Sequence, residues 1–248
     1  MERLGFVAVI LLLQFKCLYC VEDCDVHATI TRRIENDGFH RDLHSLVEIV
    51  VDHADLWINC SVILEEKIPA ALYVNPDQLQ ELQRFKQLSS CAEVMGAVNI
   101  ELPEAIATEH TVIAYSPLQC TQNLLSAKLS LPVHARYRAP ISGGGHVEGH
   151  LNSPRLFLHC LEDTCLRANA QATANFSCQP CVEFTGKNCS WFSLPYETNS
   201  ITMNIRIPVG NSDLRAIVVI VTLTVTWTAT AYVLSTIFLK HSKGKSIS

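Results

Sequence analysis

The strongest constraint on this 248-residue chain is an unbroken run of 24 uncharged residues, 216–239, close to its C-terminus. As an α-helix this run would be about 36 Å long, enough to cross a bilayer with some tilt. Residues 221–230 alternate with period two, which is also typical of a buried strand. A lone strand in lipid would leave its backbone groups unpaired, whereas a helix satisfies them internally. We therefore predict one transmembrane helix at 216–239.

A shorter apolar run, residues 4–13, follows Arg3 at the N-terminus. It is too short to span a bilayer, and a charged residue followed by an apolar run is typical of a secretory signal. We predict a signal peptide over 1–20 with cleavage near Cys20; an uncleaved anchor is the alternative.

Basic residues determine the predicted orientation. Arg215 precedes the apolar run, and the tail that follows it, 240–248, contains Lys240, Lys243 and Lys245. Because cytosolic flanks carry more Lys and Arg, the tail is predicted to be cytosolic. The chain is then a single-pass type I membrane protein whose residues 21–213 form a lumenal domain.

The charge balance narrows the class of partner. The chain is 48% apolar and 17% charged, which excludes a disordered protein. Residues 21–215 contain 14 Lys and Arg against 23 Asp and Glu, a net charge of −9. Such a domain is a poor partner for polyanions, so we predict no nucleic-acid binding.

Period-two patterns dominate the segment between the two apolar runs. The clearest runs over 125–137, where apolar residues alternate with polar ones and leave His134, Arg136 and Arg138 on the exposed face. Pro132 in this run predicts a sheet edge or a bulge. Further predicted strands are 46–51, 57–64, 70–74, 94–102, 111–115, 156–160 and 201–207. The loop Ser142-Gly143-Gly144-Gly145 is predicted to join two strands.

One helix is predicted among these strands. Asn75 is a good cap and Pro76 suits the first helical position. The apolar stripe that follows consists of Leu79, Leu82, Phe85 and Leu88. The fold class is therefore mainly β: an antiparallel β-sandwich-like lumenal domain with one short helix, plus the C-terminal transmembrane helix.

Eleven cysteines indicate folding in an oxidising compartment. After cleavage near Cys20 nine remain, so at least one is expected to be unpaired or intermolecular. The disulfide candidates are Cys24, Cys60, Cys91, Cys120, Cys160, Cys165, Cys178, Cys181 and Cys189. A zinc site on Cys178 and Cys181 is the alternative; the oxidising lumen favours disulfides over metal.

Three N-glycosylation sequons occur, at Asn59, Asn175 and Asn188. In a lumenal domain each is a possible acceptor. Asn175 and Asn188 are expected to be exposed, whereas Asn59 falls within a predicted strand.

None of the candidate catalytic motifs in the sequence is complete. His146 and Glu148 with the later Cys178-Gln-Pro-Cys181 partly match zinc deaminases, but Ser177 stands where their Pro belongs. His40 and His44 have zincin spacing without the general base, and Asp23-Cys24-Asp25 lies far from any nucleotide-binding unit. Asp55, Glu65 and Glu66 are interpreted as solvated carboxylates. No cofactor-binding motif appears, so we expect no cofactor and no catalytic residue.

Four stretches resemble the PIG-X family, the phosphatidylinositol-glycan biosynthesis class X proteins. They are Asp37-Gly38-Phe39-His40-Arg41-Asp42-Leu43, Ile68-Pro69-Ala70-Ala71-Leu72-Tyr73-Val74-Asn75-Pro76, Leu131-Pro132-Val133-His134-Ala135-Arg136-Tyr137-Arg138-Ala139-Pro140 and Ile207-Pro208-Val209-Gly210. They follow the family's order, and His134-Ala-Arg-Tyr137 is the most specific piece.

This resemblance implies a non-catalytic subunit of an endoplasmic-reticulum enzyme, glycosylphosphatidylinositol (GPI) mannosyltransferase I. In that family a multi-spanning, PIG-M-like subunit adds the first mannose from dolichol-phosphate-mannose, and the PIG-X-like chain stabilises it. The rival interpretations are a type I cell-surface receptor or adhesion ectodomain and a lumenal metalloenzyme.

Two surfaces are predicted to contact such a partner. Within the membrane, Thr224, Thr228, Ala231 and Ser235 form a small-residue stripe of the kind that packs helices together. Thr222, Thr226 and Thr230 form a rival stripe, and simple lipid exposure is the alternative. In the lumen, the cationic face at His134, Arg136 and Arg138, with Tyr137 beside it, is predicted to meet acidic loops; a solvated face is the alternative.

Overall fold

The computed structural model describes residues 26–245, except 53, 55–56, 58, 89, 162–165, 167–170 and 179–187, and except the side chains beyond 238. The predicted signal peptide 1–20 lies outside the described residues. So do Asp55, Cys24, Cys165 and Cys181, and their predictions stay untested.

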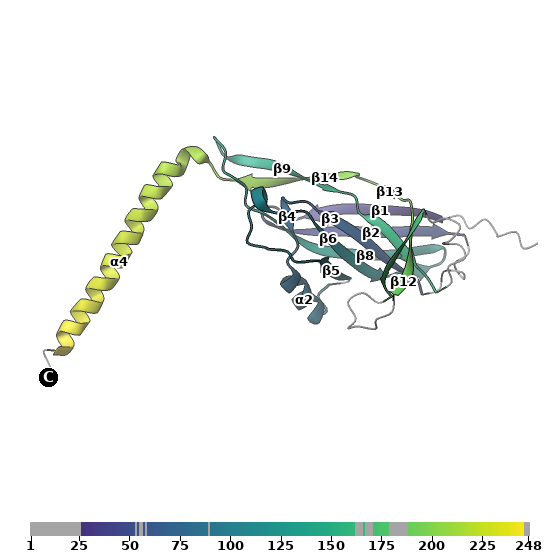
Figure 1. Cartoon of the computed structure of the whole chain (residues 1–248), viewed down its shortest axis with the longest axis horizontal. Coiled ribbons are helices and arrows are strands. Elements are labelled where there is room, and N and C mark those ends of the chain that lie inside the picture. The colour runs from purple at the N-terminus through teal and green to yellow at the C-terminus, as the bar shows by residue number, and fades with distance from the viewer. Residues whose placement is uncertain are drawn as a thin grey trace, which may run out of the picture.

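Two six-stranded sheets and a two-stranded ribbon make up the domain (Figure 1). The first sheet has the order β13 (Glu197–Thr198), β1 (Val26–Glu35), β2 (His40–Val51), β8 (Leu124–Ala135) and β4 (Leu72–Tyr73), with β7 (Gln119–Thr121) also on β8. The second has the order β11 (Ala172–Ser177), β12 (Asn188–Ser193), β10 (Arg155–His159), β3 (Ser61–Ile68), β6 (His110–Pro117) and β5 (Cys91–Met95). The ribbon pairs β9 (Gly145–Asn152) with β14 (Thr202–Val209).

Almost every strand pair is antiparallel; the exception among the described strands is the short pairing of β1 with β13. The predicted fold class is confirmed: the structure is mainly β, with antiparallel sheets and one long C-terminal helix. The helical elements of the described part of the chain are α2 (Pro76–Arg84), η2 (Glu104–Ile106), η3 (Ser212–Leu214) and α4 (Arg215–Lys245).

The core lies between the two sheets. On β8 the predicted inner residues, such as Leu125, Leu129 and Val133, are all buried. Val62 and Leu64 of β3 face them from the second sheet. Period-two burial of apolar side chains is therefore what brings the two sheets together. A smaller cluster, Ile63, Ile113, Phe157 and Trp191, packs on the other face of the second sheet.

The predicted helix forms as α2. The Asn75 side chain accepts hydrogen bonds from the backbone N–H groups of Asp77 and Gln78, and Pro76 begins the helix. Leu79 is its buried anchor, but Phe85 is exposed. The helix thus packs along a narrower stripe than its apolar spacing predicts.

The predicted strand 94–102 is wrong beyond Met95. β5 ends there because Gly96 adopts a φ of +83°, which turns the chain out of the sheet. The residues that follow form a loop instead.

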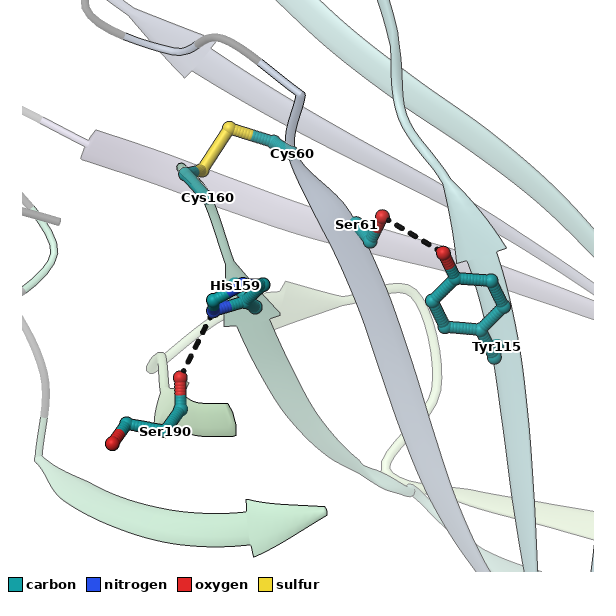
Figure 2. Close-up of a disulfide and its surroundings, with 6 residues drawn as sticks. All are labelled: Cys60, Ser61, Tyr115, His159, Cys160 and Ser190. Carbon is teal, nitrogen blue, oxygen red and sulfur yellow. Dashed lines mark hydrogen bonds between the residues drawn. A yellow bond between two sulfur atoms is a disulfide. The ribbon is translucent and has the colours of Figure 1, made fainter. Parts of the chain in front are cut away.

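Disulfides fasten the second sheet. Cys60 and Cys160 are bonded at the adjacent ends of β3 and β10, although 100 residues separate them in sequence (Figure 2). Beside this bond, the Ser61 hydroxyl lies within hydrogen-bonding distance of the Tyr115 hydroxyl. The His159 ring lies within hydrogen-bonding distance of the Ser190 carbonyl. Cross-linking so long a loop restricts the unfolded chain strongly, by about 4–5 kcal/mol in a chain-entropy account.

Cys178 bonds to Cys189 and closes the hairpin of β11 and β12. A disulfide sulfur cannot be a zinc thiolate, so the zinc alternative on Cys178 and Cys181 is wrong. Cys91 is also disulfide-bonded, whereas Cys120 is a free and exposed thiol.

The end of the chain is long and apolar enough to span a membrane. The 27 residues Ser212–Phe238 have a mean hydropathy of 2.0. Their hydroxyl groups bond to the preceding turn of the helix, as when Thr224 donates to the Ile220 carbonyl and Thr228 to the Thr224 carbonyl. This pattern lets a threonine-rich helix exist in lipid without exposed donors.

One ion pair lies inside the sandwich. Arg32 of β1 donates two hydrogen bonds to Glu66 of β3, at 2.9 and 2.8 Å, and both side chains are almost completely buried. Burial raises the pKa of Glu66 to about 7, while the Arg32 guanidinium acts in the opposite direction. The interpretation of Glu66 as a solvated carboxylate is therefore wrong.

Replacing one member of this pair should destabilise the fold more than replacing both members together. We expect Arg32→Met or Glu66→Met alone to lower the free energy of unfolding by about 3–5 kcal/mol, because each leaves a buried charge unpaired. The double variant should be more stable than either single variant. Chemical denaturation of the full chain in detergent measures all three.

A matched control is the exposed pair of Arg33 and Glu35, 3.0 Å apart. Arg33→Met should cost about 1 kcal/mol or less. A double variant no more stable than the worse single variant would contradict the argument.

Candidate interaction site

The outer face at the end of β8 is covered, not exposed. His134 is 7% and Arg136 3% exposed, so the prediction of a solvent-facing cationic surface there is wrong. Helix α2 covers His134, and the loop at 99–102 covers Arg136. Both segments are distant from the end of β8 in sequence. Tyr137, which alternation places on the buried face, is 74% exposed because β8 ends at Ala135.

His134 occupies the centre of a polar cluster. Its Nε2 lies 2.6 Å from Oε1 of Gln78 on α2, and its Nδ1 lies 2.8 Å from Nδ1 of His40 on β2. Since the Gln78 oxygen can only accept, neutral His134 donates through Nε2 and accepts through Nδ1, and His40 supplies the proton between the rings. Tyr73 of β4 stacks on His134, with ring centroids 5.0 Å apart.

Arg136 is a buried cation without a carboxylate partner among the described residues. Its Nη1 donates to the carbonyls of Asn99, Ile100 and Leu102, at 2.9, 3.4 and 2.7 Å. Its guanidinium lies 4.8 Å from the centroid of the Tyr73 ring, a cation–π contact. Burial lowers the pKa of Arg136 from its ordinary value. The residues after Gly96 leave the sheet and turn toward the Arg136 guanidinium, which their carbonyl groups then bind.

The four stretches that resemble the PIG-X family meet around this cluster. The Phe39 carbonyl accepts from the Ala135 N–H at 2.8 Å, and the Ala71 carbonyl from the Arg136 N–H at 2.9 Å. Arg41 donates to the Arg206 carbonyl on β14, just before the fourth stretch. Segments more than 160 residues apart in sequence thus form one structural unit.

This unit is joined to the start of α4. The Ile141 N–H donates to the Gly210 carbonyl, and the Ser212 N–H donates back to the Ile141 carbonyl. Ser142 and the Gly143 N–H both bond the carboxylate of Asp213. The predicted loop at 142–145 therefore holds the first turn of the membrane-length helix, and α4 leaves the domain at this end (Figure 1). Arg138 forms an ion pair with Glu104 of η2 at the same end.

The other candidate residues lie apart from this unit. His44 pairs with Glu35 rather than sharing a ligand with His40, and His146 and Glu148 sit on the exposed side of β9. No group of three potential metal ligands occurs within the described ranges. Asn59, Asn175 and Asn188 are all exposed; Asn59 lies in a turn before β3 rather than within a strand. Their glycosylation remains a prediction.

The fold and the site together define a class: a β-sandwich domain joined without a linker to one membrane-length helix, with a packed polar cluster near the junction. The chain belongs to the PIG-X / PBN1 family, which matches residues 36–238.

Curated relatives agree. The chain is 30% identical over 203 residues to the rat protein named "GPI alpha-1,4-mannosyltransferase I, stabilizing subunit", covering 82% of this chain and 78% of that one. The human protein of the same name is 28% identical over 212 residues, covering 84% and 79%. That name gives those relatives a stabilising rather than a catalytic role.

The histidines should make the fold sensitive to acid. Burial lowers the pKa of His134 below its ordinary 6.5, and His40 lowers it further while Asp42 opposes. The unfolded chain therefore binds this proton at a higher pH than the folded chain, so the stability that His134 contributes falls as the pH drops through 6.5. We expect this contribution to decrease between about pH 7.5 and about pH 5.5; His110, whose pKa burial also lowers, acts in the same direction, and Glu66, whose pKa is raised to about 7, opposes both.

Denaturation of the full-length protein in detergent across that range provides the measurement. As the pH falls, the wild type should lose more stability than His134→Gln, which lacks the His134 contribution, while His146→Gln, on exposed β9, should follow the wild type. Equal slopes for the wild type and His134→Gln would contradict the assignment.

Proposed function

We propose that this chain is the non-catalytic stabilising subunit of GPI mannosyltransferase I in the endoplasmic-reticulum membrane. The observation that carries the proposal is the match, along more than four-fifths of the chain, to relatives that bear this name. The structure supports it, because a sandwich with a single membrane-length helix offers contact surfaces in two media.

The chemistry is assigned to a separate, PIG-M-like subunit that transfers the first mannose from dolichol-phosphate-mannose. A single helix cannot enclose a polyprenyl-linked donor within the bilayer, so the catalytic cavity has to be built by a multi-spanning partner. This chain is placed with its sandwich in the lumen and its C-terminal tail in the cytosol, as a single-pass type I protein.

Deleting the gene tests this assignment. The expected result is a loss of GPI-anchored proteins from the cell surface together with a fall in the steady-state level of the catalytic subunit. Both should return when the chain is restored. Normal surface display in the deleted cells would contradict the proposal, as would mannose transfer by this chain alone.

Within the membrane, the stripe of Thr224, Thr228, Ala231 and Ser235 is proposed to pack against the catalytic subunit. Close approach of helices in lipid depends on small side chains, and these hydroxyls already bond within their own helix, so they add little bulk or polarity. The side chains of α4 make few contacts with the sandwich and are largely exposed, which leaves this surface open to a partner.

We expect Thr228→Leu with Ala231→Leu to reduce co-purification of the catalytic subunit several-fold, because the larger side chains separate the helices. The matched control is Thr226→Leu with Thr230→Leu on the rival stripe, which should leave recovery near that of the wild type. Equal recovery from both double variants would reject the assignment of the stripe.

A further inference from the structure

A cavity of about 260 Å³ lies beside the polar cluster. It is lined by residues 95–99, Leu102, residues 107–111 and Arg136. Several of these residues, including Ala97, Thr108 and Glu109, are exposed, so the cavity reaches the surface. It lies where the loop after β5 bends around the Arg136 guanidinium.

One buried donor of the cavity lining has no acceptor. The Nε of Arg136 is buried and makes no hydrogen bond, although Nη1 of the same side chain makes three. The Nδ1 of His110 is also buried, and the Thr108 backbone beside it acts as its hydrogen-bond partner. The Val74 N–H donates to Nε2 of His110 at 3.3 Å, so in the neutral ring Nδ1 carries the hydrogen.

His110 is neutral at physiological pH. Burial lowers its pKa and Arg136 lowers it further, while a hydrogen bond to the Thr108 backbone opposes them. The cavity lining therefore includes one full positive charge, that of Arg136, and one N–H group without an acceptor. A buried donor without an acceptor costs about 1–3 kcal/mol, and a buried charge costs more.

No acidic side chain of the described chain neutralises this charge. Glu104 is engaged by Arg138, and Glu109, which lines the cavity, forms no ion pair with Arg136 in the described structure. The carbonyls that bind Nη1 carry no charge. The uncompensated charge and the free N–H group of Arg136 thus favour one negatively charged group as the occupant.

We propose that this cavity receives the carboxylate of an Asp or Glu side chain from a lumenal loop of the catalytic subunit. One carboxylate supplies an acceptor for the free N–H group and one negative charge for Arg136. A phosphate would bring more negative charge toward Glu109, which lines the same cavity. The inference rests on the proposed function, because it takes the partner to be the mannosyltransferase.

The test supplies the cavity with a carboxylate from this chain. Ala97→Glu places an acidic group at the cavity and should compete with the partner's. Ala105→Glu adds the same charge on η2, outside the cavity, and Ala97→Gln adds the same bulk without charge. Each full-length variant is expressed in cells that lack the endogenous subunit, and the catalytic subunit is co-purified and quantified.

We expect Ala97→Glu to reduce recovery of the catalytic subunit at least about fivefold relative to both controls. Thermal unfolding in detergent should show Ala97→Glu to be no less stable than the wild type, because its carboxylate can compensate the charge of Arg136. Glu109→Gln should not reduce recovery. A loss with Glu109→Gln would instead identify Glu109 as the acid that neutralises Arg136, and would overturn the proposal.

The outcomes separate the two levels of inference. If the wild-type chain fails to raise the catalytic subunit, the proposed function fails. If the wild type succeeds while Ala97→Glu and the controls recover it equally, only the cavity assignment is overturned.

Replacing each lumenal Asp and Glu of the partner with its amide should then reveal one residue whose loss reproduces the effect of Ala97→Glu. A complete scan that reveals none would also overturn the assignment.

Discussion

The organising interaction of this structure is the burial of Arg136 among backbone carbonyls. To reach the guanidinium, the chain after Gly96 leaves the second sheet and aims three carbonyl groups inward. The Arg136 N–H in turn holds the Ala71 carbonyl and so places β4, whose Tyr73 lies against both Arg136 and His134. One side chain thereby fixes the geometry of the loop after β5, of β4 and of the end of β8.

That arrangement also explains how a sandwich can be coupled to a membrane helix. The unit around Arg136 continues through Arg138 into the loop at 140–144, and this loop bonds the backbone at Gly210 and the carboxylate of Asp213. No flexible linker separates these contacts from α4. A partner that binds the helix therefore meets a lumenal surface whose position relative to the helix is restricted, so the two contacts can reinforce each other.

Features that depend on neighbouring residues could be predicted from the sequence, whereas features that depend on residues far apart in the chain could not. The inner face of β8 and the cap of α2 depend on neighbours in sequence, and both predictions are confirmed. The cover over His134 and Arg136 comes from residues about 35 to 95 positions away, so alternation alone placed these side chains in solvent. The pair of Arg32 and Glu66 was missed because β1 itself was not predicted. The bond of Cys60 to Cys160 is assigned by no local pattern.

The contrast between the two buried arginines bears most directly on function. Inside the sandwich, Arg32 is neutralised by a carboxylate of its own chain and is enclosed between two sheets. Arg136 is equally buried, yet its hydrogen-bond and ring partners among the described residues are neutral carbonyls and the Tyr73 ring, and its Nε has no acceptor beside a cavity open to the surface. If Arg136 served stability alone, an internal carboxylate would be the simpler solution, since the chain uses it for Arg32. An uncompensated charge beside an open cavity is better explained by a group that arrives from another polypeptide.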